Sequence, residues 1–374
     1  MANANHLSDR PQGQTGAGAR TPRPDATAIA VIGAGSIGVR LATAFLLGGF
    51  RVSLCDPDEA RRAAAPGEIE TAAGDLAAAG LPAGLPGGLA CELHDGLHDG
   101  LSGAPAAPDQ ASADREDHDR DRGDWAARLS CTGDLAEAVG DVAMVLEAAP
   151  EKLDLKREIF TRLDAAAPPD AALASASSAL TASQFAADLP GRERCLVAHP
   201  INPPHVIRMI ELVPAPFTDP DSLARARALF ASAGYDAVTV RREIAGFVYN
   251  RLQGAVLREA YCLVRDGVVG VGDLDRLVRD ALGFRWSVVG PFETVDLNTR
   301  GGVKAHAEKL GPAYEAMGAE RSQSDPWTED LVEKVAAERR RLLPLDDWEA
   351  RVAWRDRELA ALAAFRAKRS ASRD

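Results

Sequence analysis

A histidine and a carboxylate stand twelve positions apart in "AHPINPPHVIRMIE", residues 198–211. His199 ends one apolar run, prolines stiffen the turn, and a second apolar run reaches Glu211. If the two runs pair as a hairpin, Glu211 can hydrogen-bond one imidazole nitrogen and leave the other nitrogen as a base. The alternative is a structural histidine, which is the commoner role at a strand end. His205 is the rival base, and we expect it to be an exposed turn residue because it follows two prolines.

A glycine-rich stretch near the start of the chain indicates a second site. The motif G-x-G-x-x-G covers residues 33–38, between an apolar run at 28–32 and a helix-periodic segment. In this context the glycines allow a tight turn, close approach of a diphosphate to the backbone, and close helix packing. The helix that follows directs its N-terminus at the diphosphate. The residues expected to contact a dinucleotide here are Gly33, Gly35, Ser36, Ile37 and Gly38.

Asp56 lies eighteen positions after Gly38, at the end of an apolar run that begins at residue 51. At that place a carboxylate can accept hydrogen bonds from the adenosine ribose and repels a 2′-phosphate. The sequence therefore predicts NAD as the cofactor in preference to NADP. Arg61 and Arg62 are the residues that could admit NADP, but we expect both to be solvated.

Further polar side chains follow two apolar runs, at 142–148 and 171–177. Glu147 lies near the end of the first run, Glu151 follows that run, and Ser178 follows the second. Lys156 lies one helical turn beyond Glu151, in a predicted helix at 151–163. Ligands of doubly wound sheets collect at the carboxyl ends of the strands, so Glu147, Glu151 and Ser178 fall on the ligand side, and Lys156 could reach the same place. For Glu151 and Lys156 a surface helix with ordinary charges is the alternative.

These residues need a sheet to position them. Apolar runs alternate with helix-periodic segments from residue 28 onward, which is typical of an α/β fold with a Rossmann-type doubly wound sheet. Helix periodicity resumes at 245–269 and continues to the C-terminus, with Asp273 as a helix cap. We expect an NAD-binding Rossmann domain at 28–214 and an all-helical domain at 215–374. The helical domain is expected to bind substrate and to form a homodimer.

Two segments do not fit this pattern. Residues 1–27 are polar and rich in Gly, Pro and Arg, and we expect a disordered leader. Residues from about 84 to 124 form an acidic, low-complexity insertion. His94 and His98 stand four apart in it, but the neighbouring glycines disfavour the helix that such a metal pair needs. We predict no metal site.

The overall composition limits the partners. With 374 residues, 46% hydrophobic side chains and a net charge of -12, the chain is large enough for two globular domains. The acidic balance, with six lysines, argues against nucleic acid. Five scattered cysteines fit the reducing cytoplasm, and no apolar run reaches membrane-spanning length. A small molecule is the expected partner.

Several separated motifs together resemble the 3-hydroxyacyl-CoA dehydrogenase family over roughly residues 28–300. They are "VIGAGSIG", "EAAPEKLDLKREIF", "SSAL", "AHPINPP" with "IELVP", and "GFVYNRLQ". The stretches "LGFRWSVVGPFETVDLN" and "WEARVAWRDRELAAL" are more similar to its L-gulonate 3-dehydrogenase (lambda-crystallin) branch than to the acyl-CoA enzymes. The acidic insertion departs from the family pattern, which puts the helices after Asp56 in doubt.

The resemblance assigns roles to individual residues. It implies that His199 is the catalytic base and Glu211 its partner. Ser178 and Asn250 would hydrogen-bond the reacting oxygen or the base. The NAD contacts that it implies are Asp56, Glu151 and Lys156.

The implied activity is NAD-dependent oxidation of the 3-hydroxyl of a small L-3-hydroxy acid, L-gulonate to 3-dehydro-L-gulonate. A free acid needs a cation for its carboxylate, and Arg285 or Arg251 could supply it. An L-3-hydroxyacyl-CoA such as 3-hydroxybutyryl-CoA is the alternative substrate, although residues 63–114 contain no Lys or Arg to favour it. A non-catalytic, crystallin-like NAD(H)-binding protein is the alternative from another class.

Overall fold

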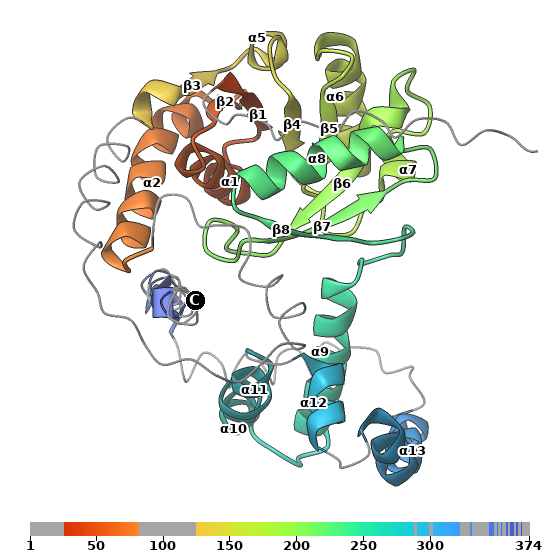
Figure 1. Ribbon diagram of the computed structural model, residues 1–374. Helices are drawn as coiled ribbons and strands as arrows, with labels where there is room; N and C mark the ends of the chain where they lie inside the picture. Colours follow the sequence, from red (N-terminus) through yellow and green to blue (C-terminus); the bar gives the residue numbers. More distant parts are fainter. Residues whose placement is uncertain are drawn as a thin grey trace, which may run out of the picture.

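The computed structural model describes residues 26–81, 125–287, 290–298 and 302–321, with scattered positions from 330 to 368. The predicted leader lies almost entirely outside these residues, and the acidic insertion lies wholly outside them. Figure 1 shows a sheet covered by helices, followed along the chain by a separate group of helices. The α/β fold with a helical C-terminal region is confirmed.

One eight-stranded sheet runs in the order β3-β2-β1-β4-β5-β6-β7-β8. Its first six strands are parallel, β7 is antiparallel to β6, and β8 is parallel to β7. The order changes direction between β1 and β4, which is where doubly wound sheets bind ligands. The strands are β1 (Ala28–Ile32), β2 (Arg51–Cys55), β3 (Leu129–Thr132), β4 (Met144–Glu147), β5 (Ala172–Ser175), β6 (Cys195–Pro200), β7 (Met209–Pro214) and β8 (Asp236–Thr239).

Helices cover both faces of the sheet, so its central strands are continuous apolar runs. One core lies beneath α1 (Ser36–Leu47), α2 (Glu59–Ala78) and α8 (Pro220–Ser232). The other lies beneath α5 (Leu135–Val139), α6 (Leu153–Ala166) and α7 (Ala182–Phe185). Every residue of β4 and β5 is buried between the two. This double cover fixes the strand ends that carry the predicted site.

The sheet extends past Pro214, where the sequence analysis placed the domain boundary. Helix α8 packs on the sheet, and β8 then pairs with β7. Two neighbouring parallel strands need a crossover connection, and α8 is that connection. Because α8 and β8 belong to the sheet domain, the helical region begins after β8 and not at residue 215.

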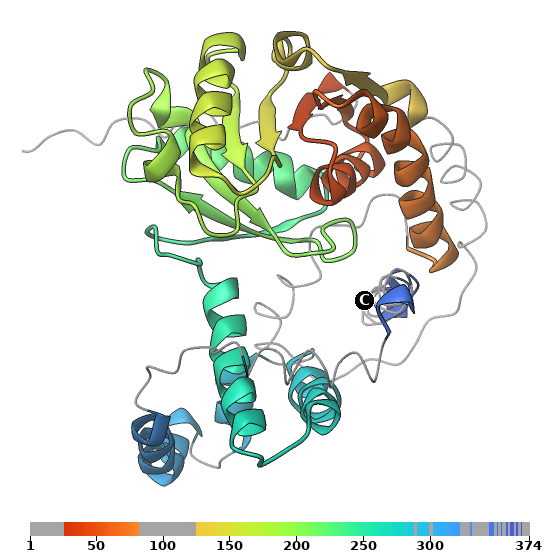
Figure 2. The same cartoon turned by 180° about the vertical axis from the view of Figure 1, so that it is seen from behind.

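The helical region contains α9 (Tyr249–Arg265), α10 (Val271–Leu277), α11 (Phe284–Trp286), α12 (Pro291–Asn298) and α13 (Gly302–Arg321). Both views show these helices on one side of the sheet domain and apart from it (Figures 1 and 2). Gly270 is the N-cap of α10, so Asp273 lies in its first turn and is not the expected cap. Among the described residues, no helix is both long enough and apolar enough to span a membrane.

Candidate active site

The glycine-rich loop joins β1 to α1 with no room for side chains at two positions. Gly33 has φ 109°, and a Cβ there would lie 2.8 Å from the carbonyl oxygen of Ala148. A Cβ on Gly38 would lie 1.8 Å from the Gly33 carbonyl oxygen. These two glycines therefore make the tight turn and the close packing of α1 that the sequence motif predicts.

Gly35 differs from Gly33 and Gly38 because a Cβ added to it would have no close neighbour. The nearest atom is Arg61 Nη1, at 4.0 Å. Helix α1 begins at Ser36 with no side-chain cap and no acidic residue in its first turn, which leaves its N–H groups and dipole for an anion. Arg40 Nε donates to Ser36 Oγ at 3.3 Å, and Ile37 packs on the core. The loop fits the diphosphate of a dinucleotide.

Asp56 directs its carboxylate at this loop. It accepts the Ala34 N–H at 2.7 Å and the Asp58 N–H at 2.9 Å, and it is 8% exposed. Each carboxylate oxygen keeps a further lone pair for a ribose hydroxyl. Arg62 was expected to be solvated, but it is half-buried and donates to the Asp56 and Pro57 carbonyls at 2.7 and 3.0 Å. Arg61 is exposed, as expected.

A buried ion pair lies behind the ends of β4 and β5. Lys156 is 1% exposed, and its ammonium donates to both carboxylate oxygens of Glu147 at 2.9 and 3.0 Å. Ser175 Oγ donates to the same carboxylate at 2.5 Å. Pairing offsets the cost of burying each charge, so the cluster stiffens this edge. Direct contact between Lys156 and NAD stays a prediction, because its ammonium is turned toward Glu147 and Glu151.

Glu151 precedes α6, which begins two residues later than the predicted helix at 151–163. The Glu151 carboxylate therefore lies outside the helix and reaches the segment that follows β5. It accepts hydrogen bonds from Ser177 Oγ at 2.5 Å and from the Ala179 and Leu180 amides at 3.0 and 3.2 Å. Burial raises the pKa of Glu151, but these bonds and Lys156 outweigh it and leave the pKa below its usual value. The sequence analysis singled out Ser178 and missed Ser177, the hydroxyl that holds Glu151.

The pairing of β6 with β7 places His199 opposite Glu211, so the predicted hairpin is confirmed. His199 Nδ1 lies 2.7 Å from Glu211 Oε2, and the two residues are 4% and 5% exposed. Burial raises the pKa of Glu211, but hydrogen bonds from His199, Tyr249 and Val248 hold it below its usual value. The carboxylate is therefore ionised at neutral pH and can stabilise an imidazolium.

His205 is 2% exposed, so the expectation of an exposed turn residue was wrong. The segment after β6 folds back against the sheet domain. Val206 is buried beside it, and the Tyr235 hydroxyl donates to the Pro204 carbonyl at 3.0 Å. The prolines therefore shape a buried turn.

The second carboxylate oxygen of Glu211 holds the start of α9. Oε1 accepts the backbone N–H groups of Val248 and Tyr249, both at 2.9 Å. Gly246 and Phe247 precede them with φ 74° and 50°, a left-handed conformation that is uncommon for a residue with a side chain. Phe247 is fully buried, with its ring centroid 5.4 Å from that of His199. Glu211 thus joins the histidine to the helical region.

Asn250 lies in the first turn of α9, and its side chain reaches the segment that follows β5. Its Nδ2 donates to the Ser178 carbonyl at 2.9 Å. Since Glu211 holds the adjacent residue of α9, Asn250 and Ser178 lie on the same edge as His199. The structure therefore brings together His199, Glu211, Ser178 and Asn250, which come from four separate segments.

Arg285 is the predicted residue that the structure does not bring to His199. It is exposed on the short helix α11, which both views show apart from β6 and β7 (Figures 1 and 2). Spacing in the sequence gave no information on this separation, because it does not say how α11 is placed relative to the sheet. The described chain alone therefore offers no contact between Arg285 and a substrate at His199.

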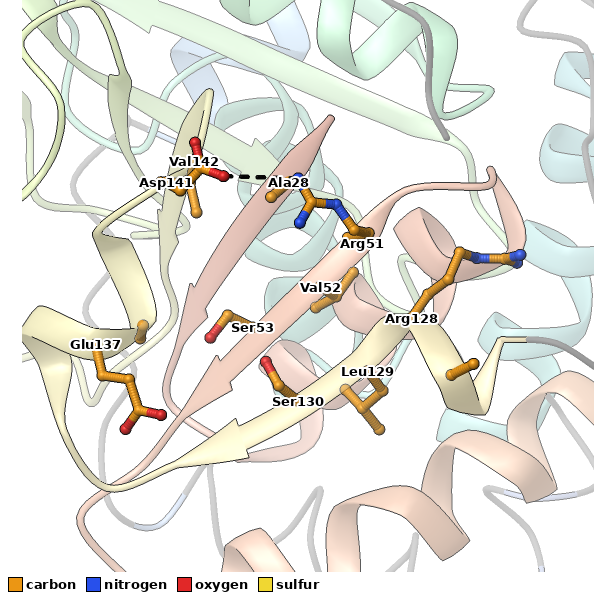
Figure 3. Close-up of a pocket in the computed structure, with 12 residues that line it drawn as sticks. Ala28, Arg51, Val52, Ser53, Arg128, Leu129, Ser130, Glu137, Asp141 and Val142 are labelled. Atoms are coloured by element: carbon orange, nitrogen blue, oxygen red, sulfur yellow. Dashed lines mark ion pairs between the residues drawn. The ribbon is translucent and has the colours of Figure 1, made fainter. Parts of the chain in front are cut away.

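A pocket of about 290 Å³ lies at the opposite end of the parallel strands (Figure 3). Its walls include Ala28, Arg51 and Leu129, the first residues of β1, β2 and β3. An ion pair of 3.7 Å joins Arg51 to Asp141 at its rim. The chemistry-bearing residues lie at the carboxyl ends, so this pocket is not the candidate active site. In the described part of the chain, no group of three or more His, Cys, Asp or Glu side chains could hold a metal, and His94 and His98 lie outside it.

Known proteins share both parts of this arrangement. The NAD binding domain of 3-hydroxyacyl-CoA dehydrogenase matches residues 28–83 and 94–244, and the C-terminal domain of the same enzyme matches residues 246–342. The structure is similar to that of 5-formyl-3-hydroxy-2-methylpyridine 4-carboxylic acid 5-dehydrogenase, an NAD-dependent dismutase. That likeness has a TM-score of 0.70 and 25% identity, and it covers 91% of this chain and 98% of the other.

The relatives include crystallins and dehydrogenases. Lambda-crystallin of Oryctolagus cuniculus is 41% identical over 246 residues, which are 63% of this chain and 73% of the relative. The lambda-crystallin homolog of Rattus norvegicus is 34% identical over 346 residues, 89% and 94% of the two chains. An L-carnitine dehydrogenase of Pseudomonas is 37% identical over 202 residues, 54% and 60% of the two chains. The chain therefore belongs to the 3-hydroxyacyl-CoA dehydrogenase family and is an NAD-dependent oxidoreductase that acts on CH–OH groups.

Proposed function

We propose that this enzyme oxidises the 3-hydroxyl of a small L-3-hydroxy acid, converting L-gulonate to 3-dehydro-L-gulonate. The observation that carries the proposal is the buried His199–Glu211 pair, with Ser178 and Asn250 on the same edge of the sheet. The similarity to lambda-crystallins supports the branch. L-carnitine is itself a 3-hydroxy acid with a free carboxylate, so the similarity to L-carnitine dehydrogenases supports the substrate class.

In this proposal His199 is the general base. Glu211 accepts the Nδ1 hydrogen bond, which leaves Nε2 to take the proton of the substrate hydroxyl. The imidazolium that forms is stabilised by the Glu211 carboxylate beside it. Bound NAD supplies the acceptor for the hydride that leaves C3. The Ser178 hydroxyl and the second N–H of Asn250 hold the reacting oxygen as it becomes a carbonyl.

The cofactor contacts follow from the other strand ends. The glycine loop and the N-terminus of α1 hold the diphosphate, and Asp56 accepts the ribose hydroxyls. Glu151 is half-exposed between β4 and β5, next to the place where the nicotinamide half would lie. Lys156 contributes by pairing with Glu151 at 3.4 Å.

A comparison of substrates tests the proposal. Purified enzyme with NAD is assayed by NADH absorbance on L-gulonate, L-carnitine, 3-hydroxybutyrate and 3-hydroxybutyryl-CoA. We expect the highest kcat/KM with L-gulonate. A higher value with 3-hydroxybutyryl-CoA would establish the acyl-CoA alternative. No turnover of any of these substrates, together with tight NADH binding, would favour the crystallin-like alternative.

The active form in this proposal is a homodimer formed through the helical region. Helix α9 presents Leu252 at 61% exposure and Leu257 at 36%. Phe284 and Phe292, on α11 and α12, are 74% and 80% exposed. Apolar side chains at such exposure on neighbouring helices indicate an interaction surface, and most soluble assemblies are symmetric homo-oligomers.

The location in this proposal is the cytoplasm. The described cysteines include Cys55, Cys131 and Cys195, which are free thiols. Burial raises the pKa of Cys195 to about 12, so this thiol stays protonated and unreactive at neutral pH. Free thiols of this kind suit a reducing compartment.

A further inference from the structure

Two aromatic rings flank the imidazole of His199, and they differ in exposure. The Phe247 ring is fully buried in the core beneath α6. The Tyr249 ring has its centroid 6.3 Å from that of His199 at an interplanar angle of 57°, and Tyr249 is 40% exposed. Phe247 therefore packs against the His199–Glu211 pair (the dyad) from the core, while Tyr249 borders this dyad on the side open to solvent.

The backbone of Tyr249 is fixed even though its side chain is exposed. Its N–H donates to Glu211 Oε1 at 2.9 Å, and Glu211 Oε2 is bound to His199. The next residue, Asn250, is bound to the Ser178 carbonyl. Contacts on both sides thus hold the backbone of Tyr249, which keeps its Cα beside the base.

The phenol is a polar group that the proposed mechanism leaves unused. Asn250 and Ser178 are assigned to the reacting oxygen, and Ser177 is bound to Glu151. Within the described residues, the Tyr249 hydroxyl makes no hydrogen bond. A phenol both donates and accepts, which suits an alcohol, whereas a carboxylate is better matched by a cation.

The geometry points to Tyr249 as a substrate-binding residue that selects polyhydroxy acids, through a hydrogen bond between its phenol and a substrate hydroxyl other than the one oxidised. The inference rests on the proposed function, since it assumes that the substrate binds at His199. It accounts for a choice that the dyad cannot make, because the dyad acts on any 3-hydroxyl placed beside it. Simple 3-hydroxy acids lack the second hydroxyl and do not gain from the contact.

The test compares Tyr249→Phe with the wild-type enzyme on L-gulonate and on 3-hydroxybutyrate. The change removes one oxygen and keeps the ring against His199. We expect KM for L-gulonate to rise about fivefold, the loss of one neutral hydrogen bond. The kcat for L-gulonate, the KM for 3-hydroxybutyrate and the affinity for NADH should stay near wild type.

Tyr314→Phe is the matched control. Tyr314 lies on α13, is 57% exposed, and stacks on His306 with the same centroid distance of 6.3 Å. It should leave both KM values unchanged.

The possible failures are distinguishable. An unchanged KM for L-gulonate in Tyr249→Phe, or an equal rise for both acids, overturns this inference and leaves the proposed function standing. A fall in kcat with KM unchanged, or weaker NADH binding, also overturns it, because the phenol then serves the reaction or the cofactor. Absence of wild-type turnover with L-gulonate overturns the proposed function and this inference together.

Discussion

The sheet domain buries its large apolar side chains, whereas the described part of the helical region leaves several of its own exposed. Both faces of the sheet are lined by side chains with exposures near zero, among them Phe45, Phe160 and Phe230. Phenylalanines in the helical region are mostly in solvent, and Phe292 is 80% exposed. Most of the chemistry that depends on fixed distances lies on the sheet domain, next to its strand ends, and α9 adds Asn250. These exposed apolar side chains are the basis of the proposed dimer.

The largest effect is expected from removing His199, the proposed base, which lies in the sheet domain. His199→Ala should lower kcat by about 10²- to 10⁴-fold, the usual contribution of general base catalysis. NADH affinity, measured by fluorescence titration, should stay near wild type, because the glycine loop lies on other strands. Wild-type turnover in this variant would remove the assignment of His199 as the base.

A pair of glycine substitutions tests how rigid the sheet domain is. Gly38→Ala places a Cβ 1.8 Å from the Gly33 carbonyl, so the backbone must move. We expect a loss of about 1–3 kcal/mol or more in the free energy of unfolding, with loss of NADH binding. Gly74→Ala on α2 meets nothing within 4 Å and should stabilise by about 0.4–1 kcal/mol. Equal unfolding midpoints in denaturant would contradict the close packing of α1.

In the helical region, a polar substitution on α9 should weaken the association of subunits more than it destabilises the fold of each subunit. Leu252→Ser, at a position 61% exposed, should shift the protein toward monomer in sedimentation analysis. Its melting temperature should then depend less steeply on protein concentration than that of the wild type, because unfolding of a monomer is not coupled to dissociation. A wild-type protein that sediments as a monomer would show that the exposed apolar residues serve another purpose.

The hydrogen bonds that Glu211 accepts from the start of α9 join the sheet domain to the helical region, and they should weaken as the pH falls. The pKa of Glu211 is lowered in the folded protein, so its stabilising contribution is present above the unfolded-state pKa and is lost as pH falls through the folded one. Glu211→Gln cannot ionise and lacks this contribution. Melting temperatures of the two proteins should differ most at neutral pH and converge in acid. A constant difference across the acid range would mean that Glu211 is not ionised in the folded state.

The smallest effect is expected at Arg285. Since this side chain is exposed and apart from His199, Arg285→Met should leave both the melting temperature and KM for L-gulonate near wild type. A steep rise in KM at unchanged stability would instead show that dimerisation brings Arg285 to a substrate site.

Local patterns predicted the parts of the site that depend on strands. The glycine spacing, Asp56 and the His199–Glu211 register follow from short-range rules, and the structure bears out their geometry. Contacts between distant segments were not predictable in this way. Nothing in the sequence near Ser177 indicates that it binds Glu151, and the burial of His205 depends on how its turn packs on the sheet domain. The expected boundary after residue 214 does not match the sheet for the same reason, since no local pattern shows that β8 returns to pair with β7.

The bonds from Val248 and Tyr249 to Glu211 have a consequence for local unfolding. These two amides can exchange with solvent deuterium only when they leave the carboxylate, which also loosens the hold on His199. Their exchange rates therefore report how often the dyad is dismantled in the native protein. They can be followed in the resting enzyme, without substrate or turnover.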